Sequence, residues 1–241
     1  MSISRILPLF VRKGISRAIV SVVPELRAVR KVIRTAEAGE RNEFQRCCDD
    51  SFQRRLATYP VALRTAYWEN HFEWRGVAAW KEMPERILDF GCGSGHSDIM
   101  LARAGRTVHG VDGSPIGIAI AKYAADREPA SVAEKLSFSL ADVTVDGPPC
   151  ARFDAVWSSH VFEHIADPGP ALRGLENWVN PGAVLLVSVP LGHAYEDPGH
   201  VNHFPDEEAL RAYLEPHIAV IRTAVDRRHR VIRALCGFAS S

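Results

Sequence analysis

The sequence lacks the features of several protein classes. It has no net charge, because 29 Lys and Arg residues balance 29 Asp and Glu residues, which gives no electrostatic reason to expect a nucleic-acid partner. It has no run of about 18 uncharged apolar residues, which a membrane-spanning helix would need. Its five cysteines are odd in number and form no C-x-x-C pair. Neither a disulfide framework nor a zinc site is therefore predicted, and a reducing cytoplasm is expected.

Charge is nevertheless unevenly distributed along the chain. Residues 1–36 contain eight Lys or Arg residues and a single acid, Glu25. Apolar residues of this segment, such as Ile6 and Phe10, recur on one stripe of an amphipathic helix. Three interpretations are open: a lid packed over the domain, peripheral attachment to anionic lipid through the apolar stripe, or a dimer contact. The first apolar run is interrupted by Pro8 and is too short for a signal peptide.

The pattern of apolar residues along the sequence changes near residue 80. Residues 1–80 have helical patterns, including an aromatic-rich stretch over 60–80, and are predicted to form a helical cap. Residues 81–241 instead alternate short apolar runs with helix-like segments, which predicts parallel strands covered on both faces. The expected strands are Arg86–Phe90, Thr107–Val111, Leu136–Leu140, Ala155–Trp157, Ala183–Val189, His217–Val225 and Arg230–Phe238, and the expected helices are Asp98–Ala104, Pro115–Ala125 and Pro168–Trp178.

The most specific local pattern is a glycine on every second residue after the first expected strand. The strand ends at Asp89, and Gly91, Gly93 and Gly95 follow. Glycine allows a tight turn and lets a ligand lie against the main chain. The spacing differs from the G-x-G-x-x-G of dinucleotide sites, and the Asp89 carboxylate would repel a pyrophosphate but suit a cationic or amine-bearing ligand. The alternative is an ordinary turn between strand and helix.

Two more acids end the next two expected strands. Asp112 precedes Gly113 and Ser114, and Asp142 precedes Val143. An acid in the position of Asp112 can accept the ribose hydroxyls of a nucleoside, and Asp142 would be within reach of an adenine amine. The carboxyl ends of parallel strands meet at one crevice, where open α/β sheets bind ligands. Taken singly, Asp112 and Asp142 could instead be helix N-caps.

Five motifs, in this order, resemble those of the class I S-adenosylmethionine-dependent methyltransferases. They are Asp89-x-Gly91-x-Gly93-x-Gly95, Asp112, Asp142, Phe153-Asp154-Ala155-Val156 and Asn180-Pro181-Gly182-Ala183. The stretches 161–168 and 199–204 are similar to those of the small-molecule methyltransferases that include quinone-biosynthesis enzymes. The resemblance covers about residues 81–241. It implies an α/β, Rossmann-like, doubly wound sheet of seven strands with a C-terminal antiparallel hairpin, preceded by the helical cap.

The resemblance also implies a cofactor, S-adenosylmethionine, and the residues that bind it. Their expected roles run from the methionine end to the adenine end. At the methionine end, the loop lies under the ligand through Gly91, Gly93 and Gly95, its amino group is associated with Asp89, and the backbone of Ser158 faces it. The ribose is bound by Asp112 with the adjoining Gly113. The adenine lies beside Ser114 and is held by Asp142 and the backbone of Val143.

Transfer of the methyl group to a small or medium acceptor, preferentially at oxygen, is the activity implied. A hydroxyl acceptor has to lose its proton, and histidine is the usual base near neutral pH. Histidines follow the fourth and fifth expected strands at positions 160, 164, 193, 200 and 203. His160 or His200 is predicted as the base, whereas His164 is expected to hold its loop by a hydrogen bond. Glu163 is left open as structural or functional.

A metal site is weighed but not predicted. Glu196, Asp197, His200 and His203 have the chemistry of metal ligands and are close in sequence, yet such residues also populate polar loops.

Three competing functions remain open. A membrane-associated lipid or quinone methyltransferase would use residues 1–36. An NAD-dependent oxidoreductase shares the acid after the second strand, but the glycine spacing and Asp89 oppose it. A non-catalytic cofactor-binding protein is the third. Methylation of a nucleic-acid base is disfavoured, because Ser158-Ser159-His160 is not the turn that holds a flipped base. The oligomeric state is not predicted.

Overall fold

The structure is a computed structural model that describes residues 24–39, 42–43, 45–46, 48–49, 84–148, 152–195 and 197–239. The predicted helix over 60–80 and the stripe through Ile6 and Phe10 lie outside these residues. The elements are α2 (Pro24–Glu37), β1 (Arg86–Phe90), α6 (His96–Arg103), β2 (Thr107–Asp112), α7 (Pro115–Ala125), α8 (Ala130–Ala133), β3 (Leu136–Leu140), β4 (Phe153–Ser159), the 3-10 helix η3 (Phe162–His164), α9 (Gly169–Trp178), β5 (Val179–Pro190), α10 (Glu207–Leu214), β6 (Ala219–Asp226) and β7 (Val231–Gly237).

The seven strands form one sheet in the order β3-β2-β1-β4-β5-β7-β6. The first five strands in this order run parallel, and β7 is antiparallel to both β5 and β6. This confirms the predicted seven-stranded sheet and its C-terminal hairpin. The chain moves outward from β1 to β3 and then returns to β4 on the other side of β1. The crevice at the carboxyl ends of β1 and β4 is therefore the switch point at which such sheets bind ligands.

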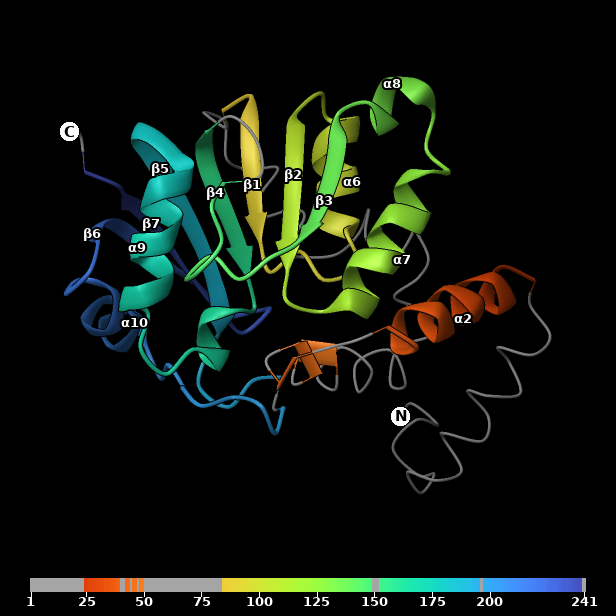
Figure 1. Cartoon of the computed structure of the whole chain (residues 1–241). Helices are drawn as coiled ribbons and strands as arrows, with labels where there is room; N and C mark the ends of the chain where they lie inside the picture. The colour runs from red at the N-terminus through yellow and green to blue at the C-terminus, as the bar shows by residue number, and fades with distance from the viewer. Residues whose placement is uncertain are drawn as a thin grey trace.

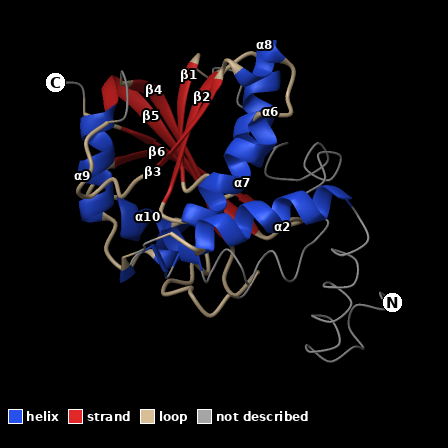
Figure 2. Ribbon diagram, turned by 45° about the vertical axis from the view of Figure 1, so that its right-hand side comes forward, coloured by secondary structure: helices blue, strands red, loops and turns tan. Residues whose placement is uncertain are grey.

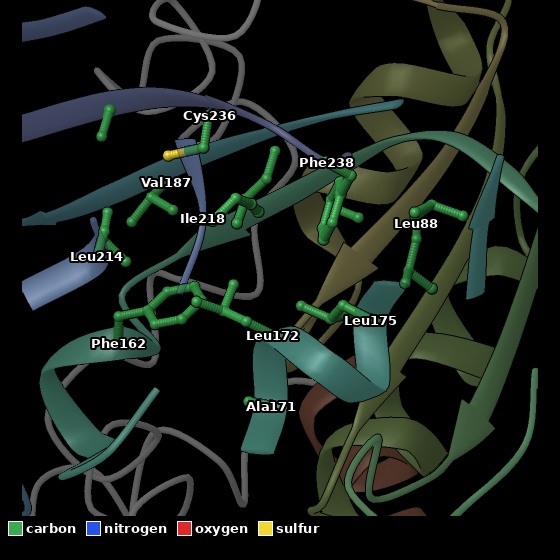
Figure 3. Packing of buried hydrophobic residues seen from close by; sticks show 14 of the residues in the cluster. Leu88, Phe162, Ala171, Leu172, Leu175, Val187, Leu214, Ile218, Cys236 and Phe238 are labelled. Atoms are coloured by element: carbon green, nitrogen blue, oxygen red, sulfur yellow. The ribbon is translucent and has the colours of Figure 1, made fainter. Parts of the chain in front are cut away.

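Helices cover both faces of the sheet. Figure 2 shows α9 on one side and α6 and α7 on the other. On the α9 side, Phe162, Leu172, Leu175 and Leu214 belong to one buried cluster (Figure 3). On the other side, α7 packs on Phe138 of β3 through buried Ile118 and Ala121, among others. Because both faces are buried, the central strands appear in the sequence as continuous apolar runs.

The strands differ from their predicted extents where polar residues lie at their ends. β4 and β5 are both longer than expected. β4 also includes Ser158 and Ser159, which pair with Val187 and Ser188, and β5 also includes residues 179–182 and Pro190, with Val179 paired to Phe153. The helix α10 was not predicted. It begins after Asp206, whose side chain accepts a hydrogen bond from the N–H of Ala209, and it buries Leu210 and Leu214.

The described part of the N-terminal segment packs on the domain. Val32, Ile33 and Ala36 of α2 lie against Ile116 and Ile120 of α7, and Figure 1 shows the two helices next to one another. This packing buries an apolar face of α2, and the lid, lipid and dimer interpretations of residues 1–36 stay predictions. Across the described residues, no helix combines the length and the apolar character needed to cross a bilayer.

Candidate functional site at the carboxyl ends of the parallel strands

The glycine loop has a conformation and a packing that both require glycine. Gly91, Gly93 and Gly95 all have positive φ, at 82°, 54° and 74°. A Cβ atom at Gly91 would lie 2.2 Å from Cγ2 of Val161, and one at Gly95 would lie 2.8 Å from Cβ of Ala121. Because Val161 follows β4, the loop is fitted against that strand's connection as well as against α7. The positive φ values and these contacts explain why glycine occupies these positions, and the role of the loop in binding stays a prediction.

Asp112 fixes the loop to the end of β2. Its Oδ2 accepts a hydrogen bond from the N–H of Gly93 at 2.8 Å, and its Oδ1 accepts one from the N–H of Ser114 at 2.7 Å. The helix N-cap is Ser114 rather than Asp112, so that alternative for Asp112 is wrong. Each carboxylate oxygen has about two lone pairs, so Asp112 retains the capacity to accept ribose hydroxyl groups.

Ser114 connects α7 to the N-terminal segment. Its Oγ accepts a hydrogen bond from the N–H of Gly117 at 2.9 Å and donates one to Oδ1 of Asp49 at 2.6 Å. The N–H of Ile116 donates to the same Asp49 oxygen at 3.0 Å. Asp49 is fully buried and was missed by the sequence analysis. No local pattern could have found it, because the contact joins residues far apart in the chain.

A second buried acid lies beside Asp89. Asp89 and Asp98 are 2% and 0% exposed. Asp89 pairs with Gly110 of β2, and Oδ1 of Asp98 would lie 2.6 Å from a Cβ at Gly110, so the two acids are neighbours. Burial, followed by the neighbouring charge of Asp98, raises the pKa of Asp89 well above its usual range. Burial likewise raises the pKa of Asp98 to about 7. Asp98 was missed because an acid in the first turn of a helix is favourable even at the surface.

The remaining predicted cofactor residues also lie at this edge of the sheet. Oδ1 of Asp142 accepts hydrogen bonds from the N–H and the hydroxyl of Thr144, so Asp142 begins a turn and not a helix. Val143 is buried, and a Cβ at Gly174 of α9 would lie 1.9 Å from its carbonyl oxygen. The hydroxyl of Ser158 donates to the carbonyl of Phe90 at 3.0 Å, which joins β4 to β1.

Both predicted bases converge on one buried carboxylate, that of Glu163. Nδ1 of His160 lies 3.1 Å from Oε1 of Glu163, and Nε2 of His200 lies 3.9 Å from the same oxygen. His160 is one of the non-glycine residues with positive φ, at 56°, a conformation that costs energy and is found at functional sites. Burial lowers the pKa of His200, and the charge of Glu163 partly opposes this.

The loop after β5 is fastened to this cluster. The N–H groups of Val201 and Asn202 donate to the carbonyl of Glu163 at 2.9 and 3.0 Å. Nδ1 of His164 lies 2.9 Å from the carbonyl oxygen of Gly199, which confirms that His164 holds the loop. The two stretches similar to quinone-biosynthesis methyltransferases, 161–168 and 199–204, are therefore in direct contact.

The same cluster could hold a metal ion. Glu163, His164 and His200 each offer one ligand atom, and these atoms lie within 4.8 Å of one another. Oε2 of Glu163 is buried and has no hydrogen-bond partner in the part of the chain that the structure describes. Carboxylate and imidazole suit several divalent cations. Of the four residues weighed from the sequence, His200 belongs to this group, and Glu196 lies outside the described residues.

Known proteins with similar sequences are methyltransferases. The family model of a methyltransferase domain matches residues 68–223. A ubiquinone biosynthesis O-methyltransferase from Azorhizobium caulinodans is 40% identical over 103 residues, which are 43% of this chain and 39% of that protein. Its mitochondrial counterpart from Arabidopsis thaliana is 35% identical over 104 residues, 43% of this chain and 31% of that protein. The chain thus matches about two fifths or less of the length of these relatives.

Solved structures share the fold at low sequence identity. The glycopeptide N-methyltransferase MtfA in complex with S-adenosylmethionine has a TM-score of 0.57 at 15% identity, covering 68% of this chain and 92% of that one. The [4+2]-cyclase SpnF has a TM-score of 0.59 at 17% identity, covering 70% of this chain and 80% of that one. Fold, strand order and the matched family model agree. The chain belongs to the methyltransferase domain family, that of the class I S-adenosylmethionine-dependent methyltransferases.

Proposed function

We propose that this chain binds S-adenosylmethionine along the glycine loop and methylates a hydroxyl oxygen of a small acceptor of the quinol type. The observation that carries the proposal is the convergence of two acids, Asp89 and Asp112, on one glycine loop beside the His160–Glu163 pair. The relatives named ubiquinone biosynthesis O-methyltransferases support oxygen as the methylated atom.

The residues present fit this cofactor. Asp112 has both carboxylate oxygens oriented by backbone N–H groups and can accept the ribose hydroxyls. Asp89 offers a buried acid for the cationic amino group, and the open backbone of Gly93 allows close approach. Asp142 and Val143 follow β3 at the adenine end. When bound, the cofactor would supply an electrophilic methyl group on a sulfonium sulfur.

His160 is the base that the geometry favours for the acceptor hydroxyl. Glu163 lies next to Nδ1 of His160 and holds the imidazole in the tautomer with its proton on that nitrogen, which puts the basic lone pair on Nε2. The bound cofactor would supply the methyl group, whose bond to sulfur would break as the acceptor oxygen bonds to the carbon, leaving S-adenosylhomocysteine. Nε2 of His160 would take the proton of the acceptor hydroxyl. Such proton removal contributes about 10²–10⁴-fold in rate.

A divalent cation is the second candidate for activating the acceptor. The unpartnered Oε2 of Glu163 and the nearby nitrogens of His164 and His200 favour it. A bound cation would lower the pKa of a coordinated hydroxyl group without any proton acceptor on the protein. A chelator separates the two candidates: activity that survives EDTA belongs to the histidine base, and activity that is lost and then restored by a divalent ion belongs to the cation.

We further propose that the acceptor is a small molecule reached from the aqueous side, with peripheral membrane contact through residues 1–36 if the acceptor is lipophilic. Residues 1–80 would act as the cap that shapes the acceptor site. The apolar face of α2 is already packed on α7, so lipid contact would fall to residues before it.

Binding and turnover test the proposal separately. Calorimetry with S-adenosylhomocysteine is expected to show saturable binding that Asp112→Ala weakens. Transfer of a labelled methyl group to a panel of quinols and catechols is expected to fall by about 10²–10⁴-fold in His160→Ala. The affinity for S-adenosylhomocysteine should stay unchanged in that variant. His217→Ala, which removes a histidine paired with Asp167, is the matched control.

Two results would contradict the proposal. If calorimetric titration of the folded protein with S-adenosylhomocysteine shows no heat of binding, the proposed cofactor site is wrong. Binding without turnover of any acceptor would favour a non-catalytic protein, and the [4+2]-cyclase among the fold neighbours shows that this fold alone does not determine the reaction.

A further inference from the structure

Asp98 occupies an unusual position for an acid. It lies in the first turn of α6, yet its side chain is fully buried against β2. A Cβ atom built on Gly110 would lie 2.6 Å from Oδ1 of Asp98 and 2.8 Å from Sγ of Cys92. The carboxyl thus fills the space over Gly110, directly beneath the glycine loop.

The surroundings of Asp98 are acidic. Among the described residues, neither of its oxygens has a partner with hydrogen-bond geometry. Asp89 lies opposite Gly110 in the ladder between β1 and β2, and Oδ1 of Asp98 lies over Gly110, so the two carboxyl groups are neighbours. The other titratable groups that face the pair are the carboxylate of Asp112 at the end of β2 and the thiol of Cys92 in the loop. On α6 itself, burial lowers the pKa of His96 to about 4, so that histidine is neutral.

Two carboxyl groups can hydrogen-bond to each other only when one of them holds a proton. Two neighbouring buried carboxylates would repel one another strongly if both were ionised, as in other carboxyl pairs that share a proton. Burial is the largest cause of the raised pKa at both acids. The charge of Asp98 also raises the pKa of Asp89, whereas the interaction with Asp89 partly opposes the rise at Asp98. The pair therefore carries one proton at neutral pH and takes up a second in acid.

We infer that Asp98 is a positioning residue of the cofactor site: it shares a single proton with Asp89, and the amino group of the cofactor binds to this singly protonated pair. Arrival of the ammonium group favours the ionised form of Asp89, so the proton passes to Asp98 and stays in the pair. This inference rests on the proposed cofactor site. It adds a residue that the glycine motif does not include.

A dependence on pH follows. Below about pH 7 the free pair is doubly protonated and neutral, so binding of the ammonium group has to release one proton to the buffer. Above that pH the pair is already singly protonated and no proton is released. Affinity for S-adenosylhomocysteine should therefore fall by about tenfold from pH 8 to pH 6, as linkage to one proton requires.

Calorimetry on the whole chain tests this directly. Titrations with S-adenosylhomocysteine at pH 6 and pH 8, in phosphate and in imidazole buffer, count the protons released on binding. Wild type should release about one proton at pH 6 and almost none at pH 8. Asp98→Asn gives Asp89 a permanent amide donor, so proton release at pH 6 should vanish and the affinity should become nearly independent of pH. Asp126→Asn, which changes an exposed acid at the end of α7, should behave as wild type.

A measurement on the protein alone keeps the two proposals distinguishable. At pH 8, wild type and Asp126→Asn should show the infrared C=O band of a protonated carboxylic acid, and Asp98→Asn should lack it. Wild type that releases no proton at pH 6, or a band that persists in Asp98→Asn, would overturn the shared proton. Absence of S-adenosylhomocysteine binding at every pH would instead overturn the proposed function, and the infrared result would still decide whether the proton is shared.

Discussion

Replacing Gly91 by alanine isolates a single steric contact on which the cofactor loop depends. The new Cβ would lie 2.2 Å from Cγ2 of Val161, and the residue would keep a φ of 82°. A left-handed conformation costs a non-glycine residue about 1–2 kcal/mol. Forcing an extra carbon into a packed contact costs about 1–3 kcal/mol more. We therefore expect Gly91→Ala to lower the free energy of unfolding by about 2–5 kcal/mol.

Two further variants separate these contributions. Gly105 has a φ of 92°, but a Cβ there would meet no atom within 4 Å, so Gly105→Ala should lose only the conformational part, about 1–2 kcal/mol. Combining Gly91→Ala with Val161→Ala should remove the steric part, giving a coupling energy of about 1–3 kcal/mol in a double-mutant cycle. Urea unfolding with an unchanged m-value measures five proteins: wild type, Gly91→Ala, Gly105→Ala, the double variant, and the single variant Val161→Ala that the cycle also needs. Equal losses in the two glycine variants, or no coupling to Val161, would refute the steric argument.

Four other outcomes are expected. The raised pKa of Asp98 contributes stability that is complete below about pH 4 and lost as the pH rises to about 7. Asp98→Asn should therefore be more stable than wild type at pH 8, on the order of a few kcal/mol, with the advantage shrinking toward pH 4 in thermal or urea unfolding. Zinc ions should raise the melting temperature of wild type but not of Glu163→Gln, because the latter loses a ligand oxygen; an equal rise in both would place the ion elsewhere. Asp49→Ala leaves the N–H of Ile116 without its acceptor and should lower the free energy of unfolding by about 1–3 kcal/mol, measured by urea unfolding; no change would show that water replaces it. Deleting residues 1–36 should reduce sedimentation with anionic vesicles, and added salt should do the same to the intact chain; undiminished sedimentation of the truncated chain would remove the lipid interpretation.

The strands of the sheet could be predicted because the residues within each strand are enough to indicate it, without knowledge of distant contacts. The strands Arg86–Phe90 and Leu136–Leu140 and the helix Pro115–Ala125 have the predicted bounds. The central strand β1 is marked by a buried apolar run, and the edge strand β3 by the alternation of apolar and polar residues. The end of β4 was not predictable, because Ser158 and Ser159 join the ladder through backbone groups that carry no side-chain signal. The start of β5 was missed because Asn180, Pro181 and Gly182 do not form an apolar run.

The candidate site was predictable where its residues follow strands in sequence. Asp89, the glycine loop and Asp112 follow strand ends, so fold topology brings them together. Asp49 and Asp98 were out of reach, because one depends on a contact 65 residues away and the other on which face of a short helix is buried. The sequence contained both predicted bases, but only packing shows that His160 and His200 share the carboxylate of Glu163.

The bond from Ser114 to Asp49 has a consequence for how this architecture can diversify. Replacing the N-terminal region by that of another protein is expected to change which acceptor is methylated. The same replacement would be expected to leave the cofactor-binding residues of the domain unchanged. Here one residue of that region stabilises the start of the helix beside the expected ribose site. A graft of another amino-terminal region would have to supply an equivalent acceptor for the N–H of Ile116, or donor affinity would change together with acceptor preference.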